Sequence, residues 1–225
     1  MRAFSLSGLL LAAAAPAPAQ TVTYNATIDF TPGLPNPNGV WFYAYTANLA
    51  GTLTPFAAYS LNSSAQVYSW STNLSAGAPA IFFNFGRSTI NGLPPNELAL
   101  HPGPTGEYAV LSFNAPAAGT YEVTAQFFAG DTGLTDATIV LNGQASSPIF
   151  FAANTGTNPA YSGSLILNLG DRVDFAVGAP VSFFSGTTPI AVNLTLVPIP
   201  EPSSLLSLLL GVPLVVIWGR RRRHP

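Results

Sequence analysis

His101 is the single histidine between residue 20 and the last six residues, and this scarcity limits the chemistry open to the protein. A general base that works near neutral pH is most often a histidine, and a nucleophile needs such a base within reach. The chain has no cysteine, which excludes thiol nucleophiles and thiolate metal sites. No Gly-x-Ser-x-Gly, phosphate-loop or His-Glu-x-x-His motif is present. The sequence therefore predicts a protein that is not an enzyme and gives His101, in a Pro/Gly turn, a structural role.

Carboxylates offer two further kinds of chemistry. Eight acidic residues lie between 20 and 198, so a paired-carboxylate glycoside hydrolase stays open as an alternative, although none forms a local pair. The segment from Asp131 to Asp136 places two carboxylates and several carbonyls in one loop, which could hold calcium. It departs from the EF-hand pattern and lacks that motif's bidentate glutamate, so we interpret it as a surface turn. No cofactor is predicted.

Aromatic side chains are the candidates for sugar binding. Trp41, Tyr43 and Tyr45 alternate along one face of a predicted strand, and Trp70 follows nearby in the sequence. Exposed rings in such a row could stack on glycan rings. The alternative, which we favour for most of them, is that these rings fill the core.

The composition sets the class of protein. Hydrophobic residues make up 48% of 225, enough for a core, whereas charged residues make up 7% against roughly 25% in an ordinary domain. Glycine (20) and proline (21) favour many turns over long helices. Between 20 and 198 two arginines face eight acidic residues, a net charge of −6 that excludes nucleic-acid binding.

Alternating apolar residues predict a β-sandwich. Period-two or β-rich runs recur along the middle of the chain with Gly, Pro and Asn turns between them, at residues 21–30, 40–47, 56–61, 66–70, 80–85, 108–114, 121–129, 137–141, 165–169, 173–177 and 190–196. We expect Asn142-Gly143 to form a two-residue hairpin turn, and Gly170-Asp171 to turn the chain between the strands on either side of it. About ten strands predict a single all-β jelly-roll domain over 20–198.

The N-terminus has the pattern of a signal peptide. Arg2 precedes an apolar run over 6–15, and Ala17-Pro18-Ala19 supplies an Ala-x-Ala cleavage site before Gln20. We expect export by the Sec machinery and removal of residues 1–19 by signal peptidase.

The C-terminus has the pattern of a membrane anchor. An uncharged segment over 203–219 is followed by four arginines, Arg220, Arg221, Arg222 and Arg223. Seventeen helical residues span about 25 Å, slightly less than the roughly 30 Å hydrocarbon core. The arginines should stay on the cytoplasmic side, which leaves the preceding domain outside the inner membrane.

The segment before that helix resembles a known sorting signal. Pro200-Glu201-Pro202-Ser203, an apolar helix and a terminal arginine cluster are similar to the PEP-CTERM signal of certain Gram-negative bacteria, also known as the "ice-binding protein C-terminal domain". The resemblance covers about residues 199–225. It implies that an inner-membrane exosortase recognises Pro200, Glu201, Pro202 and Ser203, removes the helix and releases the protein to the cell surface or extracellular matrix. Ice binding is not implied for the domain.

The middle of the chain has a second resemblance. Ala118-Gly119-Thr120-Tyr121, Asn142-Gly143 and Leu167-Asn168-Leu169-Gly170-Asp171-Arg172-Val173 are similar in order and spacing to galactose-binding-like and carbohydrate-binding-module jelly rolls. This likeness implies the fold rather than a ligand. We therefore expect a non-catalytic exported surface or matrix protein. The alternatives are a module that binds extracellular polysaccharide, a secreted hydrolase, and a structural component that self-associates.

Overall fold

The structure is a computed structural model that describes residues 21–33, 35–73 and 78–197. Residues Thr21–Val197 form one compact unit. The predicted signal peptide (1–19, with Ala17, Ala19 and Gln20) and the predicted sorting signal (199–225) lie outside the described residues. Within the described ranges, no helix has the length and apolar character needed to cross a bilayer.

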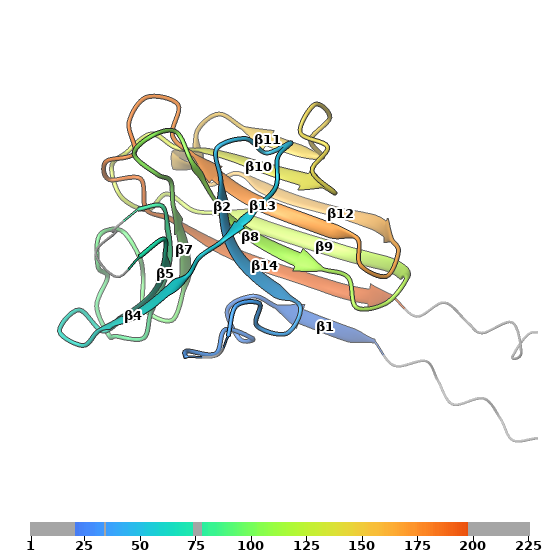
Figure 1. The fold of residues 1–225 in the computed structure, drawn as a ribbon, viewed down its shortest axis with the longest axis horizontal. Coiled ribbons are helices and arrows are strands. Elements are labelled where there is room, and N and C mark those ends of the chain that lie inside the picture. Colours follow the sequence, from blue (N-terminus) through green and yellow to red (C-terminus); the bar gives the residue numbers. More distant parts are fainter. Residues whose placement is uncertain (1–20, 34, 74–77, 198–225) are drawn as a thin grey trace, which may run out of the picture. The chain divides into compact units, whose positions relative to one another are not determined.

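The described part is built from β-strands, as predicted. It contains fourteen strands and one 3₁₀ turn, η1 (Thr155–Thr157), and the strands form two antiparallel sheets (Figure 1). The predicted number of about ten is too low because three short strands were missed: β3 (Thr54–Pro55), β7 (Leu98–His101) and β11 (Phe150–Ala152). Strands of two to four residues are too short to show a period of two.

The larger sheet has eight strands. Its order is β12-β9-β14-β7-β6-β5-β4, so β12 and β4 lie at the two ends of this path, and β1 pairs with β14 beside it. The bounds are β12 (Ala160–Leu167), β9 (Gly119–Phe127), β14 (Thr188–Val197), β6 (Ala80–Asn84), β5 (Val67–Ser71), β4 (Ala58–Asn62) and β1 (Val22–Asn25).

The second sheet has six strands in the order β11-β10-β13-β8-β2-β3. Its remaining bounds are β10 (Asp136–Leu141), β13 (Arg172–Gly178), β8 (Tyr108–Asn114) and β2 (Trp41–Thr46).

The core lies between the two sheets. Alternate residues of each strand enter it, such as Val123 and Phe127 from β9 and Phe175 from β13, all buried. Full burial of such a side chain contributes about 1.5–3 kcal/mol. The outer face of the six-stranded sheet is covered as well, because Ala176 there joins a small apolar cluster with Leu49 and Leu53.

The predicted Asn142-Gly143 hairpin differs from the structure, whereas Gly170-Asp171 turns the chain between two strands as predicted. Asn142 does adopt a positive φ of 50°, but β10 returns as β11 only after residues 142–149 instead of closing a two-residue hairpin. Gly170-Asp171 joins β12 in the larger sheet to β13 in the smaller one, so it connects the sheets. Alternation marks each strand but carries no information about which sheet receives it.

Candidate ligand-binding groove

A groove lies on the outer face of the eight-stranded sheet, over β4, β5 and β6. Its volume is about 240 Å³, somewhat below the roughly 300–1,000 Å³ of pockets for drug-sized ligands. It is lined by side chains of three strands and by two segments that fold over them: Ser60, Asn62, Ala65, Val67, Ser69, Phe82, Ile90, Asn91, Leu93 and Thr187.

The floor of the groove follows from strand register. Ser60 pairs with Ser69, and Ser69 pairs with Phe82, so these three side chains form one row across three strands. Their neighbours Tyr59 and Trp70 point to the core instead, because successive side chains of a strand alternate between faces. The two serine hydroxyls are 2.7 Å apart and hydrogen-bond to each other. The row therefore presents two hydroxyls beside one aromatic ring.

Asn84 holds one wall of the groove in place. This residue has no exposed surface, and its Nδ2 donates to the carbonyl oxygens of Ser88 and Leu93, both at 2.9 Å. Its Oδ1 accepts from the backbone N–H of Gly86 at 2.9 Å. A buried amide with several partners fixes a loop because losing any of them leaves a polar group unpaired. The segment after β6 is thus fastened over the sheet.

The tip of that wall is a tight turn. Ile90 and Leu93 exchange backbone hydrogen bonds of 3.0 and 2.8 Å around Asn91 and Gly92, whose φ angles are 47° and 74°. Positive φ at both central residues is the type I′ geometry that Asn-Gly favours. A Cβ on Gly92 would also lie 2.2 Å from the backbone of Gly130, so the turn packs directly on that segment.

The residues that line the groove include polar side chains but no charged ones among those described. None of the described residues that line the groove is Asp, Glu, Lys, Arg or His. Asn62 uses its Oδ1 to accept from Ala65 N at 3.0 Å. The Asn62 Nδ2 and the whole Asn91 amide have no hydrogen-bond partner within the described chain, which leaves donors and an acceptor for a ligand. Hydroxyls, free amides and one ring suit an uncharged polyhydroxylated molecule.

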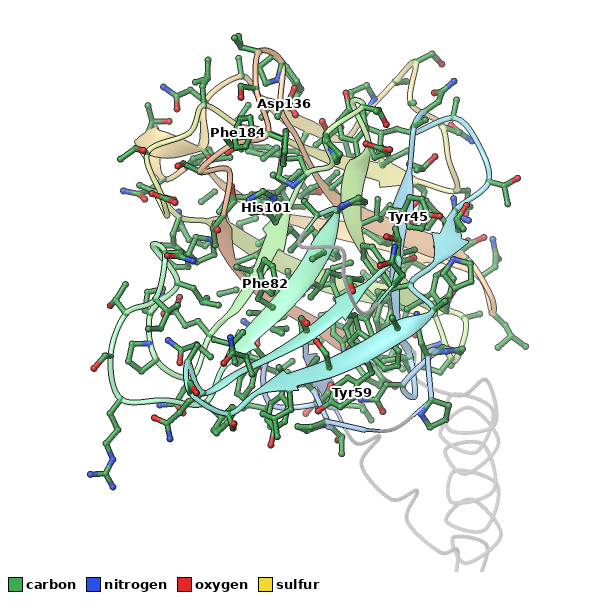
Figure 2. All side chains as sticks on the ribbon, turned by 60° about the vertical axis from the view of Figure 1, so that its left-hand side comes forward. Tyr45, Tyr59, Phe82, His101, Asp136 and Phe184 are labelled. Atoms are coloured by element: carbon green, nitrogen blue, oxygen red, sulfur yellow. The ribbon has the colours of Figure 1, made fainter. Side chains whose placement is uncertain are left out.

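His101 lies beside the groove on β7. Its ring is 6.2 Å from that of Phe82 and 6.2 Å from that of Phe183, and its Nδ1 is 2.9 Å from the carbonyl oxygen of Pro102 (Figure 2). Burial lowers the pKa of His101, so the neutral ring is favoured. These contacts are those of a packed, oriented side chain.

The aromatic residues proposed for sugar stacking lie in the core. Trp41, Tyr43 and Trp70 are 1%, 1% and 6% exposed, which leaves no ring face for a glycan. Tyr43 stacks on Trp70 at 6.1 Å, and Trp41 Nε1 donates to Asp29 Oδ2 at 3.0 Å. The half-buried Tyr45 stacks on Phe56 at 5.4 Å. Burial thus excludes glycan stacking on Trp41, Tyr43 and Trp70, in agreement with the core role that we favour for most of these rings, whereas Tyr45 keeps part of its surface exposed.

The two carboxylates considered for calcium have separate backbone partners. Asp131 Oδ1 accepts from Thr132 N at 2.8 Å, and Asp136 Oδ1 accepts from Gly178 N at 3.0 Å. In the part of the chain that the structure describes, no three His, Cys, Asp or Glu side chains gather in a way that could hold a metal ion. Burial raises the pKa of Asp136, the residue labelled near the top of Figure 2.

None of the groove residues was predicted from the sequence to belong to a binding site. Ser60 and Ser69 lie in two predicted strands, and Phe82 in a third, but only the pairing of those strands brings the three side chains together. Serines alternating with apolar residues are the signal that marks this face as outward.

No protein-family model and no curated relative matches the chain. Among solved structures it is similar to a family 35 carbohydrate-binding module from Clostridium thermocellum, with 17% identity, a TM-score of 0.30, and coverage of 57% of this chain and 87% of that one. It is also similar to Xyl-CBM35 in complex with a glucuronic acid containing disaccharide, with 17% identity, a TM-score of 0.28, and coverage of 45% of this chain and 74% of that one. A third similar structure is Pika GITRL, with 12% identity, a TM-score of 0.31, and coverage of 40% of this chain and 79% of that one. These similarities assign no role to any residue of this chain.

Proposed function

We propose that the described domain is a non-catalytic module that binds an uncharged glycan in the groove over β4, β5 and β6. One observation carries this proposal: the groove combines a ring, hydroxyls and free amides with no charged group among its described lining residues. A sugar presents apolar C–H faces that stack on rings and hydroxyls that both donate and accept hydrogen bonds.

The absence of charge from this lining favours neutral sugars over acidic ones. A uronic carboxylate would lose hydration on entering the groove and would find no cation there to compensate. The net charge of −6 between residues 20 and 198 adds repulsion at longer range. The small, open site also favours modest affinity, because only a few sugar units contact it.

The experiment is a calorimetric titration of the 20–198 domain with neutral and uronic oligosaccharides of equal length. The proposal expects saturable binding of a neutral oligosaccharide and none of the acidic one. Incubation of the same mixtures followed by chromatography tests the hydrolase alternative, and intact oligosaccharides are expected. Heat signals for the acidic series alone would contradict the proposal.

We further propose that this module is exported, held for a time in the inner membrane and processed by an exosortase for delivery to the cell surface or matrix. Support comes from the sequence: the Ala-x-Ala site before Gln20, the Pro200-Glu201-Pro202-Ser203 motif, and the arginines at 220–223. Prolines at 200 and 202 remove backbone donors and favour extended geometry, which suits recognition by a processing enzyme. A glycan-binding module in that location would attach the protein to exopolysaccharide.

A further inference from the structure

We infer that the β12 margin of the eight-stranded sheet pairs with β12 of a second copy of this chain. β12 is eight residues long and pairs only with β9 among the described strands. An open margin exposes a row of backbone N–H and C=O groups, which other proteins commonly protect with charges, prolines or bulges. Ala160–Leu167 contains no charged residue and no proline.

The direction of the free backbone groups follows from one hydrogen bond. Phe127 N donates to Pro159 O at 3.0 Å, and these two residues continue the register in which Ala160 pairs with Gln126. In an antiparallel ladder, residues alternate between those that bond to one neighbour and those that point away from it. The odd-numbered residues of β12 therefore bond to β9. The even-numbered ones, Ala160, Ser162, Ser164 and Ile166, direct their N–H and C=O groups outward.

Self-pairing of β12 can satisfy all of these groups in one register. Directly opposite residues must lie on the same face of the combined sheet, so an even residue must oppose an even residue. With a twofold axis at Gly163, Ala160 opposes Ile166 of the second copy, and Ser162 opposes Ser164 of the second copy. A shift of two residues would leave either Ala160 opposite Asn168 or Ile166 opposite Asn158, in each case beyond one end of the strand. The register centred on Gly163 is therefore selected.

Side chains on the outer face agree with this register. Ile166 is 82% exposed in the single chain, and the pairing would place it against Ala160 of the second copy. The two serine pairs can hydrogen-bond across the junction, with no like charges facing each other. The nearby acidic residue Glu122 lies on β9, one strand inside the margin, where its Oε1 accepts a hydrogen bond from Ser164 Oγ at 2.6 Å.

The other sheet margins are less suitable. β4 has five residues, β1 four, β11 three and β3 two, so each exposes fewer groups to a partner strand. Because β4 and the groove lie at the opposite margin from β12, pairing would leave both grooves open at the two ends of a continuous sheet.

A cross-linking experiment tests the register, using the lack of native cysteine. Full-length Ser162→Cys and Ser164→Cys proteins, one carrying a larger tag, are purified in detergent, mixed and oxidised. Opposite residues in this pairing are about 5.5 Å apart between Cα atoms, within reach of a disulfide. We expect a mixed disulfide dimer from the mixture and little dimer from either protein alone. The matched control mixes Thr124→Cys, exposed on β9, with Ser164→Cys and should give none.

Absence of the mixed dimer from a folded mixture would overturn the inference, as would equal cross-linking of Ser162→Cys alone. A second measurement uses Ser162→Lys, which places a cation on the junction. Sedimentation should show the wild-type protein at twice the monomer mass and Ser162→Lys at the monomer mass. Thr124→Lys, with the same charge one strand inside, should remain dimeric. A wild-type protein that sediments at the monomer mass would also overturn the inference.

Discussion

The Nδ2 of Asn84 donates to the carbonyl oxygen of Leu93 at 2.9 Å, and this bond ties the wall of the groove to its floor. Asn84→Ala would also leave the Ser88 carbonyl and the Gly86 N–H without their partner. Each unpaired buried group costs about 1–3 kcal/mol, so we expect a loss of roughly 3 kcal/mol in the free energy of unfolding. Urea denaturation measures this loss.

Asn193→Ala, which removes a single side-chain hydrogen bond to Asn25, is the control and should lower the free energy of unfolding by about 1 kcal/mol or less. Equal costs would contradict the assignment of the wall to Asn84.

Phe82→Ala should weaken glycan binding by about tenfold, which corresponds to about 1.4 kcal/mol. The physical reason is the loss of the one aromatic ring among the described residues that line the groove. Calorimetric titration with a neutral oligosaccharide measures the effect, and denaturation of the same variant shows whether it is folded. Phe151→Ala is the matched control, since this phenylalanine is 59% exposed on the other sheet. If Phe151→Ala lost binding while Phe82→Ala kept it, the ligand would lie on the six-stranded sheet, and the proposed groove would be wrong.

Asp174 should make the stability depend on pH. Burial is the largest influence and raises the pKa of Asp174, although Ser112 donates to it at 2.7 Å and Arg172 pairs with it at 2.8 Å. A carboxyl with a raised pKa in the folded state favours folding while it is protonated, and this contribution is lost as pH rises through that pKa. The stability of the wild-type protein relative to Asp174→Asn should therefore fall as the pH rises above about 4, the ordinary pKa of an aspartate. A relative gain over that range would mean that pairing with Arg172 outweighs desolvation.

Export should leave Gln20 as the first residue of the mature protein. Mass spectrometry of the protein recovered from outside the cytoplasm of an exosortase-containing host measures both ends of the chain. Glu201→Lys should block removal of the tail, since it replaces the acid of the sorting motif, whereas Pro198→Ala, just outside the motif, should be processed normally. A protein found in the cytosol with residues 1–19 intact would contradict the export proposal.

Alternation in the sequence locates individual strands but does not always give their ends. The run over 108–114 coincides with β8, because seven residues are enough for a period of two to stand out. The first run, over 21–30, was predicted too long. β1 ends at Asn25, whose Oδ1 accepts from the backbone N–H groups of Thr27 and Ile28 and turns the chain. A local side-chain bond of this kind competes with the ladder, and alternation does not reveal it.

The candidate site could not be predicted in the same way. Ser60 and Phe82 are 22 positions apart and meet only because β5 lies between their strands, which is a property of sheet order. The same limit applies to Trp41 and Tyr43: alternation shows that they share a face, but only the packing on both sides of their sheet shows that this face is closed. Which face of a strand is open depends on what packs against it, and that information is not local.

The central claim, that the groove over β4, β5 and β6 holds an uncharged glycan, is tested most directly by NMR. Titration of the isotope-labelled 20–198 domain with a neutral oligosaccharide should shift the side-chain amide signals of Asn62 and Asn91, the two groove amides. The amide of Asn48, in a separate groove beside Tyr108 on the other sheet, serves as the internal control and should stay in place. Saturating shifts at Asn62 and Asn91 are the predicted result. Shifts confined to Asn48, or none at any amide for every neutral glycan tested, would contradict the account.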